Sequence, residues 1–323
     1  MVGRRRGTPG WRYARAALED AAAERYGRQA HVGWASRCGD GLFRDLFAAS
    51  VSTGREDDAK ILGKLVAAVP RSDAPHFEIA DRVVREVELL TRLAGMDLEI
   101  RVPGWASAQR VGNRTVLVRE VVCGFPMPMK VAELAAFDPL EIVAWVAATV
   151  HDIDPEPLRD VVPVNASRRD HALARVQEVE EIAGNPVADE ALRWLREHLP
   201  REAPAAVVHG DLLGQNIILP LDGEPGLGLI DWEYCCIGDP AYDLAIVTRG
   251  GRKPFGRARG RELLVDAYLE AAGHVEVSTI DVAFHEMAMI AGWYLESLQG
   301  RGHGHPPETC LQRLRALLRR LPA

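Results

Sequence analysis

The sequence predicts an α+β protein with a small strand-rich domain followed by a larger, mostly helical domain. Hydrophobic patterning supports this division. Short apolar runs separated by turn residues prevail before Gly124, whereas apolar residues recur three and four positions apart in most segments after it. The chain has 323 residues, which is enough for two domains of ordinary size. We expect an N-terminal arm and helix over residues 1–30, the small domain over 31–123 and the larger domain over 124–323.

The first part of the chain contains one expected helix and then the elements of the small domain. The first helix covers residues 10–29, where apolar side chains return at helical spacing. A Gly-containing turn that enters a strand is expected over residues 38–51, and further strands are expected over 60–69, 98–102 and 115–122. The spacing of apolar residues predicts a second helix over 79–93, and Gly95 suits its C-terminal stop. The Gly112-Asn113 pair provides a turn before the last strand.

The larger domain is predicted to consist mainly of helices around a segment of polar loops. Apolar residues at helical spacing predict helices over residues 140–150, 170–183, 188–199, 261–271, 279–298 and 308–321. Residues 205–243 lack this period and alternate short apolar runs with turn residues. Polar residues in that segment are therefore candidates for a functional site.

Composition and charge exclude several classes of protein. Hydrophobic residues make up 47% and charged residues 26% of the chain, which are globular values. No run of about 18 apolar residues occurs, so we expect no membrane span. The net charge of −7 argues against a nucleic-acid-binding protein, which usually carries a basic face.

Cysteine usage and the N-terminus indicate a cytoplasmic protein. The basic start of the chain is not followed by the apolar stretch of a secretory signal. Five cysteines without paired metal-binding spacing favour free thiols in a reducing compartment.

The stretch Val207–Leu219, with Gly228–Glu233 after it, contains the most informative polar residues. It places Asp211, Asn216 and Asp231 within 21 positions. Each of these alone is compatible with a simple turn, because Asp and Asn are common turn formers. The predicted order of strand, polar loop, strand, turn and strand brings Asp231 back beside the first loop, and a turn-only interpretation does not explain that convergence.

Two carboxylates and an amide in this order suit phosphoryl transfer from a nucleotide. An acceptor hydroxyl needs a base for its proton, and a triphosphate needs Mg²⁺ held by hard oxygen ligands. One side chain cannot do both jobs well. We therefore expect a catalytic carboxylate, then an amide and a second carboxylate for the metal.

These motifs resemble those of a known family. His209-Gly-Asp-Leu-Leu-Gly-Gln-Asn216 with Ile230-Asp-Trp-Glu233 resembles the catalytic segments of the aminoglycoside phosphotransferase family, which is related to protein kinases. Residues 238–245 are similar to the tract that follows the metal-binding aspartate in that family, and residues 150–155 are similar to one of its helix ends. Glu86 resembles the helix glutamate of the small domain, and the resemblance covers about residues 31–300.

The resemblance implies a bilobal protein-kinase-like fold with ATP or GTP between its lobes. Asp211 then corresponds to the catalytic base, and Asn216 and Asp231 correspond to the Mg²⁺ ligands. The spacing of five positions from Asp211 to Asn216 independently matches the kinase signature Asp-x-x-x-x-Asn. His209 is expected to be structural, with a hydrogen bond inside the loop.

The nucleotide-binding residues of the small domain are predicted less directly. A lysine paired with a helix glutamate is needed at the phosphates, and Lys64 with Glu86 is our choice because Lys64 lies in an apolar run. Lys60 is the alternative lysine and Glu88 the alternative partner. Some family members have an arginine two residues before the proline that corresponds to Pro70, where this chain has Ala68, so the register of the lysine is open.

The connection between the two domains is expected at residues 120–123. Backbone groups of Glu120 and Val122 are predicted to bind the adenine edge, although an ordinary linker is equally compatible with these residues. The Gly39-Asp-Gly41 turn is a weak candidate for covering the phosphates, because a lone Gly-x-Gly is usually just a turn.

Residues that flank the central motifs are expected to have supporting roles. Asp239 and Asp243 are predicted to cap helices and tie the site loop down. Trp232 is expected in the core, and Glu233 is expected beside the metal site.

The expected activity is transfer of the γ-phosphoryl group of ATP or GTP to a hydroxyl of a small molecule, with Mg²⁺ as cofactor. The first choice of acceptor is an antibiotic, either aminoglycoside-like or a nucleoside. A polyamine-like acceptor requires that some acidic side chains line the site; the candidates are Glu178, Glu180, Glu181, Glu286 and Glu296, although such a set is usually a solvated face. The alternatives are a metabolic kinase for a sugar, amino alcohol or nucleoside, and a kinase-fold protein that binds a nucleotide without catalysis.

Overall fold

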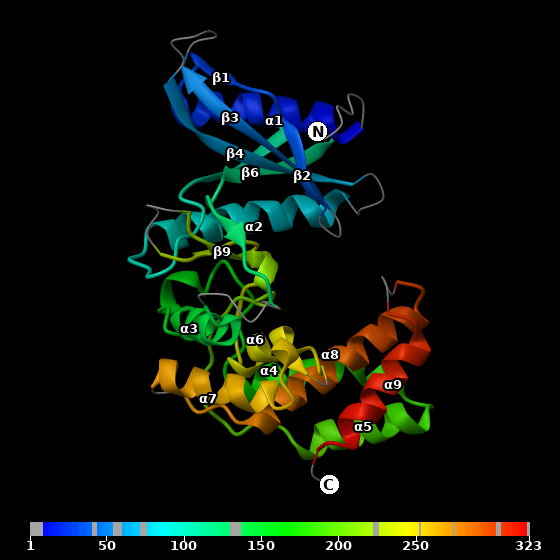
Figure 1. The fold of residues 1–323 in the computed structure, drawn as a ribbon. Coiled ribbons are helices and arrows are strands. Elements are labelled where there is room, and N and C mark those ends of the chain that lie inside the picture. Colours follow the sequence, from blue (N-terminus) through cyan, green and yellow to red (C-terminus); the bar gives the residue numbers. More distant parts are fainter. Residues whose placement is uncertain are drawn as a thin grey trace. The chain divides into compact units, whose positions relative to one another are not determined.

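The computed structural model divides the chain into two units (Figure 1). It describes residues 9–40, 44–53, 60–71, 76–129, 137–221, 226–251, 253–273, 275–301 and 305–321. The N-terminal unit comprises Met1–Gly124 and Pro220–Glu233, and the C-terminal unit comprises Phe125–Leu219 and Tyr234–Ala323. Among the described helices, none combines the length and the apolar character that a membrane crossing requires.

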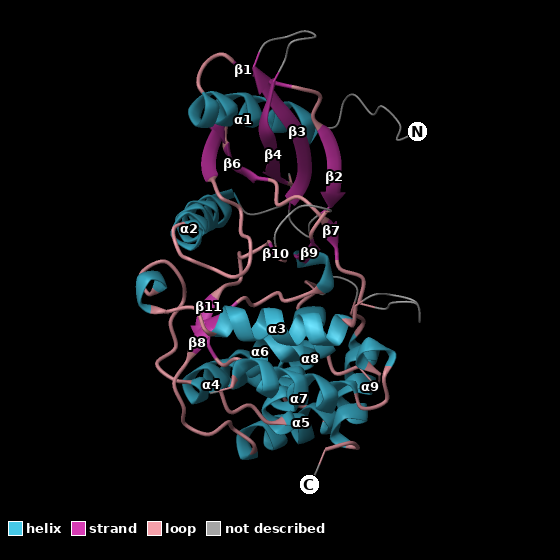
Figure 2. Cartoon of the chain, turned by 60° about the vertical axis from the view of Figure 1, so that its left-hand side comes forward, coloured by secondary structure: helices cyan, strands magenta, loops and turns pink. Residues whose placement is uncertain are grey.

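An antiparallel sheet forms the centre of the N-terminal unit (Figure 2). Its strands are β1 (Ala30–Val32), β2 (Ser36–Asp40), β3 (Arg44–Thr53), β4 (Lys60–Pro70), β5 (Ala106–Val111) and β6 (Arg114–Glu120). The order is β1-β3-β4-β6-β5, and β2 pairs with β3. The short β10 (Gly228–Leu229) also belongs to this unit.

The two faces of this sheet have different environments, because successive side chains of a strand point to opposite faces. Helix α1 (Pro9–Tyr26) covers one face, where its buried Leu18 packs in one cluster with Phe47 of β3 and Leu65 of β4. Helix α2 (His76–Ala94) packs against β5 and β6, and its Glu86 reaches Arg44, which lies on the face opposite Phe47. The first face is apolar at its centre, where β3 and β4 meet α1, and the second contains the buried pair of Arg44 and Glu86.

One predicted strand is wrong. Residues 98–102 form no strand; within this stretch Arg101 makes an isolated bridge to Gly228, and Pro103, which lacks an N–H, follows. The strand at this point of the chain is β5, six residues with the sequence ASAQRV. Hydrophobic patterning does not detect β5, because Ser107 and Gln109 on its α1 face are polar. Both residues donate hydrogen bonds to Glu24 of α1.

Helices make up most of the C-terminal unit. They are α3 (Pro139–His151), α4 (Arg168–Val179), α5 (Pro186–Glu197), α6 (Ala241–Thr248), α7 (Gly260–Ala272), α8 (Thr279–Leu298) and α9 (Pro307–Leu318). Side-chain caps define several of their starts: Asp138, Ser167 and Asn185 accept hydrogen bonds from first-turn N–H groups, and Ser278 forms a capping box with Asp281. Helices α4, α5, α8 and α9 share one apolar core.

Two short strand pairs hold the loops of the C-terminal unit. Strand β8 (Ala206–Val208) pairs with β11 (Cys236–Gly238), and β7 (Phe125–Pro126) pairs with β9 (Ile217–Leu219). The predicted helices agree with α1 to α5 and α7 to α9 within a few residues at each end. Helix α6 was missed, because its eight residues are almost all apolar and show no helical period.

Candidate functional site

The loop between β8 and β9 contains two of the predicted site residues, Asp211 and Asn216. Gly210 begins it with a φ of 81°, and a Cβ at this position would overlap the carbonyl oxygen of Tyr234, so only glycine fits without displacement of the loop. Leu212 is fully buried and anchors the middle of the loop. Gly210, which allows the sharp turn, and Leu212, which is buried, therefore determine the path of this loop.

Asp211 and Asn216 are joined side chain to side chain. The Asn216 Nδ2 donates to Asp211 Oδ2 at 2.9 Å and to the Asp211 carbonyl at 2.8 Å. Both neighbours are acceptors, so the amide has its nitrogen toward Asp211, and its Oδ1 makes no hydrogen bond to another described side chain. Asn216 is only 3% exposed, which keeps this oxygen in a defined position.

A buried network holds the loop from behind. Asp243 of α6 accepts hydrogen bonds from the backbone N–H groups of His209 and Gly210, both at 2.8 Å. His151, at the end of α3, lies 3.1 Å from Asp243 through Nε2 and 2.8 Å from the Tyr268 hydroxyl through Nδ1. Burial alone would raise the pKa of Asp243, but the hydrogen bond and charge of His151 together with His209 hold that pKa below its ordinary value.

His209 is structural, as predicted. It is completely buried, and its Nδ1 accepts a hydrogen bond of 3.3 Å from the Asp211 backbone N–H. The prediction that Asp243 ties the loop down is also confirmed by its two bonds to the loop backbone.

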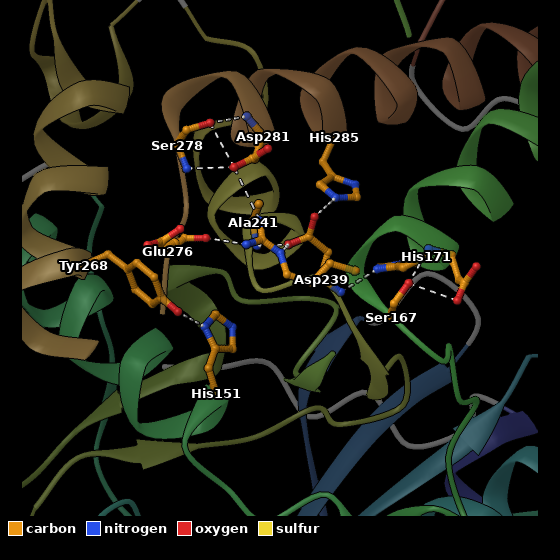
Figure 3. Close-up of polar contacts among 12 residues, drawn as sticks. His151, Ser167, His171, Asp239, Ala241, Tyr268, Glu276, Ser278, Asp281 and His285 are labelled. Atoms are coloured by element: carbon orange, nitrogen blue, oxygen red, sulfur yellow. Dashed lines mark hydrogen bonds and ion pairs between the residues drawn. The ribbon is translucent and has the colours of Figure 1, made fainter. Parts of the chain in front are cut away.

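Asp239 is the centre of a second network, shown in Figure 3. Its carboxylate accepts from Arg168 Nε at 2.7 Å, from the Ala241 N–H at 3.1 Å and lies 3.0 Å from His285 Nε2. Burial works against its charge, yet the hydrogen bond and charge of His285 and the Arg168 guanidinium lower the pKa of Asp239 to about 2. The bond to Ala241 confirms the predicted capping role at α6.

His171 completes this second network as a neutral acceptor. Its Nδ1 accepts a hydrogen bond of 2.9 Å from the Asp239 N–H. Burial, and then the neighbouring His285 and Arg175, lower the pKa of His171 to about 3. The carboxylates of Asp243 and Asp239 are therefore both satisfied inside the C-terminal unit, while the buried Nδ1 of His285 has no hydrogen-bond partner among the described residues.

Asp231, the third predicted site residue, belongs to the N-terminal unit. It follows β10 with a φ of 73°, a left-handed conformation that is uncommon for a residue other than glycine. The neighbouring Trp232 is 1% exposed and donates its Nε1–H to the Leu229 carbonyl at 3.2 Å, which confirms its predicted place in the core. The buried tryptophan fixes the chain on both sides of the Asp231 carboxylate.

The predicted ion pair between Lys64 and Glu86 is wrong. Glu86 is buried and accepts a hydrogen bond of 2.7 Å from Arg44. Arg44 lies opposite Pro70 in the pairing of β3 with β4, six residues from Lys64, and that separation is about 20 Å along a strand. Lys64 and Lys60 are both exposed, because the first half of β4 lies outside the buried part of the sheet. A role for Lys64 at the nucleotide stays a prediction.

Five ionisable side chains come together on the face of the sheet opposite α1: Arg44, Glu86, Arg119, Asp231 and Glu233, hereafter the N-terminal charge cluster. Arg44 lies 3.3 Å from Glu233 as well as 2.7 Å from Glu86. Burial raises the pKa of Glu233 to about 7; Arg44 opposes this increase, and Glu86 and Asp231 add to it. The charge of Arg82 also opposes the increase at Glu233.

Arg44 and Arg119 were not singled out from the sequence. Both lie in strands whose pattern predicts only alternation, and no local motif marks either residue. The available signal was Ala68, a small residue where some family members have an arginine, because a cation absent from one strand can be supplied by the strands beside it.

In the predicted adenine-binding segment, residues 120–123, two backbone N–H groups already donate hydrogen bonds within the protein. The Glu120 N–H donates to the Trp105 carbonyl at 2.9 Å, and the Val121 N–H donates to the Lys64 carbonyl at 3.0 Å. The Glu120 carboxylate accepts from Arg25 at 3.0 Å. The Val122 N–H has no such bond to another described residue. Gly41, part of the predicted phosphate-covering turn, lies outside the described residues, as does most of the turn over 222–226.

Three of the five acidic side chains considered for a polyamine-like acceptor have arginine partners within the C-terminal unit. Glu286 is completely buried, contacts Thr248 and lies 3.0 Å from Arg261. Glu178 and Glu180 form ion pairs with Arg175 and Arg196 on exposed surface. These positions are therefore structural or solvated.

A large cavity in the C-terminal unit does not contain the predicted catalytic residues. It has a volume of about 890 Å³, and its wall includes His151, Arg168 and Asp281. Neither Asp211 nor Asn216 lines it, so its size alone does not identify it as the acceptor site.

Comparison with known proteins gives one family match and several relatives. The family model described as "Phosphotransferase enzyme family" (APH) matches residues 55–280, more than half of the chain. A viomycin phosphotransferase from Streptomyces vinaceus is 32% identical over 201 residues, which are 57% of this chain and 66% of that protein. A homoserine kinase from Sinorhizobium medicae is 40% identical over 73 residues, which are 23% of this chain and 22% of that enzyme. The matches thus span about two thirds of the first relative and less than a quarter of the second.

Solved structures show the same fold. The macrolide 2'-phosphotransferase MphH from Brachybacterium faecium has a TM-score of 0.63 at 21% identity, and the match covers 93% of this chain and 97% of that one. The aminoglycoside phosphotransferase solved as a GDP and kanamycin complex has a TM-score of 0.62 at 16% identity, with the same coverage of 93% and 97%. The predicted α+β, protein-kinase-like fold is confirmed.

Proposed function

This chain belongs to the phosphotransferase enzyme family (APH), and we propose that it transfers the γ-phosphoryl group of ATP or GTP to a hydroxyl group of a small molecule. The observation that carries the proposal is the Asp211–Asn216 pair on a loop whose backbone is bonded to Asp243. A positioned carboxylate beside an amide oxygen is the arrangement that this reaction requires of a base and a metal ligand.

Asp211 orients the acceptor hydroxyl and takes its proton. The hydrogen bond from Asn216 and the bonds of Asp243 to the loop backbone fix the carboxylate before a substrate arrives. Most of the rate gain then comes from alignment and from electrostatic stabilisation of the transferred group, because phosphoryl transfer requires little covalent chemistry of the protein.

Asn216 and Asp231 are the residues proposed to bind Mg²⁺. The donors fit this metal: Asn216 Oδ1 has no protein partner among the described side chains, and a carboxylate and an amide oxygen are both hard ligands. Bound Mg²⁺ supplies positive charge at the phosphates. The backbone of Glu120 and Val122 is proposed for the purine, and the Val122 N–H is the donor that remains for it.

The proposed acceptor is an antibiotic. Support comes from the viomycin phosphotransferase relative and from the fold shared with a macrolide and an aminoglycoside phosphotransferase. A metabolic kinase is the second candidate, because a homoserine kinase is 40% identical over a short segment. Location in the cytoplasm is part of the proposal for either candidate, since both need the nucleotide supply of the cell interior.

An acceptor panel tests the proposal. Purified protein with Mg²⁺ and either ATP or GTP would be incubated with viomycin, macrolides, aminoglycosides, nucleoside antibiotics, homoserine and choline, and phosphorylated product would be detected by mass spectrometry. We expect product with one antibiotic class and none with the Asp211→Asn variant. Product with homoserine alone would favour the metabolic kinase. Tight nucleotide binding without any product would replace the proposal with a non-catalytic nucleotide-binding protein.

A further inference from the structure

The proposed reaction requires positive side chains at the nucleotide phosphates, yet lysines are scarce in this chain. The sequence contains only four: Lys60, Lys64, Lys130 and Lys253. Lys60 and Lys64 are exposed on β4, neither is the ion-pair partner of Glu86, and Lys253 belongs to the C-terminal unit. Lys130 lies outside the described residues.

Strand register places two arginines around a small residue of β4. Ala68 lies opposite Leu46 of β3 and opposite Leu117 of β6. Arg44 is two residues from Leu46, and Arg119 is two residues from Leu117, so both side chains emerge on the same face of the sheet as Ala68. Between them Ala68 contributes only a methyl group, where a lysine or arginine would place its own cation.

The two arginines differ in their partners. Arg44 is held by Glu86 and Glu233 at 2.7 and 3.3 Å. Arg119 is 8% exposed and makes no ion pair with any other described residue, although Glu86 and Asp231 lie near enough to affect its charge. Burial lowers the pKa of Arg119; Glu86 and Asp231 oppose this shift, and Arg44 adds a smaller contribution in the same direction as burial. The Arg119 guanidinium thus has carboxylates nearby but makes no ion pair with a described residue, so its N–H donors are left for a further anion.

We propose that Arg44 and Arg119 bind the phosphates of the nucleotide donor in place of a lysine, with Glu86 holding Arg44 in position. This inference rests on the proposed function. Its chemistry is favourable, because a guanidinium presents two parallel N–H donors that match two phosphate oxygens. The arginines approach from β3 and β6, the two strands that flank β4.

The test compares affinities for a nucleoside and for its diphosphate. Calorimetry would measure ADP and GDP, and ligand-observed NMR would measure adenosine and guanosine, for the wild type and for three variants. These are Arg119→Met, Arg44→Met combined with Glu86→Gln, and Lys64→Met; Arg110→Met, an exposed arginine of β5, is the matched control. We expect each arginine variant to lose about 10- to 100-fold in diphosphate affinity and little in nucleoside affinity, the scale of hydrogen bonds to a charged group. Lys64→Met and Arg110→Met should bind like the wild type.

The outcomes separate this inference from the proposed function. A wild type that prefers the diphosphate, with the preference lost in Lys64→Met and kept in both arginine variants, would overturn the arginine assignment and leave the phosphotransferase proposal intact. A wild type that binds no nucleotide would remove the proposed function and the inference together.

Folding is checked by thermal melting without nucleotide. Arg119→Met should melt no lower than the wild type, because it removes a buried charge that has no ion-pair partner among the described residues. Arg44→Met alone should melt lower, since it leaves Glu86 buried and unpaired, and the added Glu86→Gln change should restore much of the loss. A destabilised Arg119→Met variant would identify Arg119 as structural and contradict the inference.

Discussion

The loop of Asp211 and the N-terminal charge cluster are both buried and polar, but they are built in opposite ways. Behind the loop, Asp243 is satisfied by two backbone N–H groups and His151. In the cluster, Arg44 is paired with Glu86 and Glu233, whereas Arg119 has no ion pair with another described residue. The support behind the loop is therefore complete without a ligand, whereas the charge cluster is not.

This contrast shows how burial can serve two purposes. Matched hydrogen bonds in a low-dielectric interior make a rigid support, so the position of Asp211 does not depend on a bound substrate. A buried guanidinium without an ion pair, such as that of Arg119, raises the free energy of the empty site and favours an anionic ligand. A phosphotransferase needs both, because its base must be fixed and its nucleotide must be exchanged.

The largest effect that would sharpen this comparison is expected from Asp211→Asn. Turnover should fall by about 10²- to 10⁴-fold, because the base is removed, whereas the melting temperature should stay unchanged. The substituted amide retains an oxygen that accepts from Asn216 Nδ2, so the loop keeps its bond. Steady-state kinetics with the acceptor found in the panel, together with thermal melting, measures both quantities.

Asp20→Asn on the exposed surface of α1 is the control for the Asp211 variant, and neither quantity should change in it. Near-normal turnover of Asp211→Asn would show that this carboxylate is not the base.

A second test uses the neutral His171 of the Asp239 network. The pKa of His171 is about 3 in the folded protein and about 6.5 in an unfolded chain, so between these values the unfolded chain binds a proton that the folded protein does not. Stability should therefore decrease as the pH falls, by about 3 kcal/mol between pH 7 and pH 4 from this residue alone. Urea unfolding of the wild type and of His171→Asn across this range gives the difference, and the variant should lose less stability.

The His171→Asn variant can still accept a hydrogen bond from the Asp239 N–H through its side-chain oxygen, which limits other changes. Identical pH dependence in the two proteins would mean that His171 takes up a proton while folded, and it would then not be the neutral acceptor of the Asp239 network.

The smallest expected effect is a difference in stability between alanine variants of two glycines that both have a left-handed backbone conformation. Gly210→Ala and Gly27→Ala both place a Cβ at positive φ, at 81° and 91°, and each should lose about 1 kcal/mol for that reason. The Gly210 variant should lose about 1–3 kcal/mol more, because its Cβ meets the Tyr234 backbone, whereas nothing lies near a Cβ at Gly27. Chemical denaturation measures the two losses, and turnover should fall only in the Gly210 variant.

Equal losses in the two glycine variants would show that the loop can shift away from Tyr234 at no cost. The contrast between a fixed loop and an incomplete charge cluster would then be weaker than the structure indicates.

Residues with a local signal were predictable from sequence. Helical spacing predicted α2 and α8 almost to their ends, and the loop motif identified Asp211 and Asn216 as a pair five positions apart. Strand β5 was missed, because its polar side chains face Glu24 on a distant helix. Whether a polar side chain in a strand is solvated or bonded depends on what packs over it, and hydrophobic patterning carries no such information.

The sequence by itself determined most of the helices and the local pairing of Asp211 with Asn216, because both depend on residues that are close in the chain. Only the tertiary structure decided that Glu86 pairs with Arg44 and not with Lys64. The partners lie 42 residues apart in the chain, and the register of β3 against β4 brings Arg44, and not Lys64, to the buried end of the sheet beside α2. Charge pairing depends on distance in space, and a one-dimensional pattern does not record it.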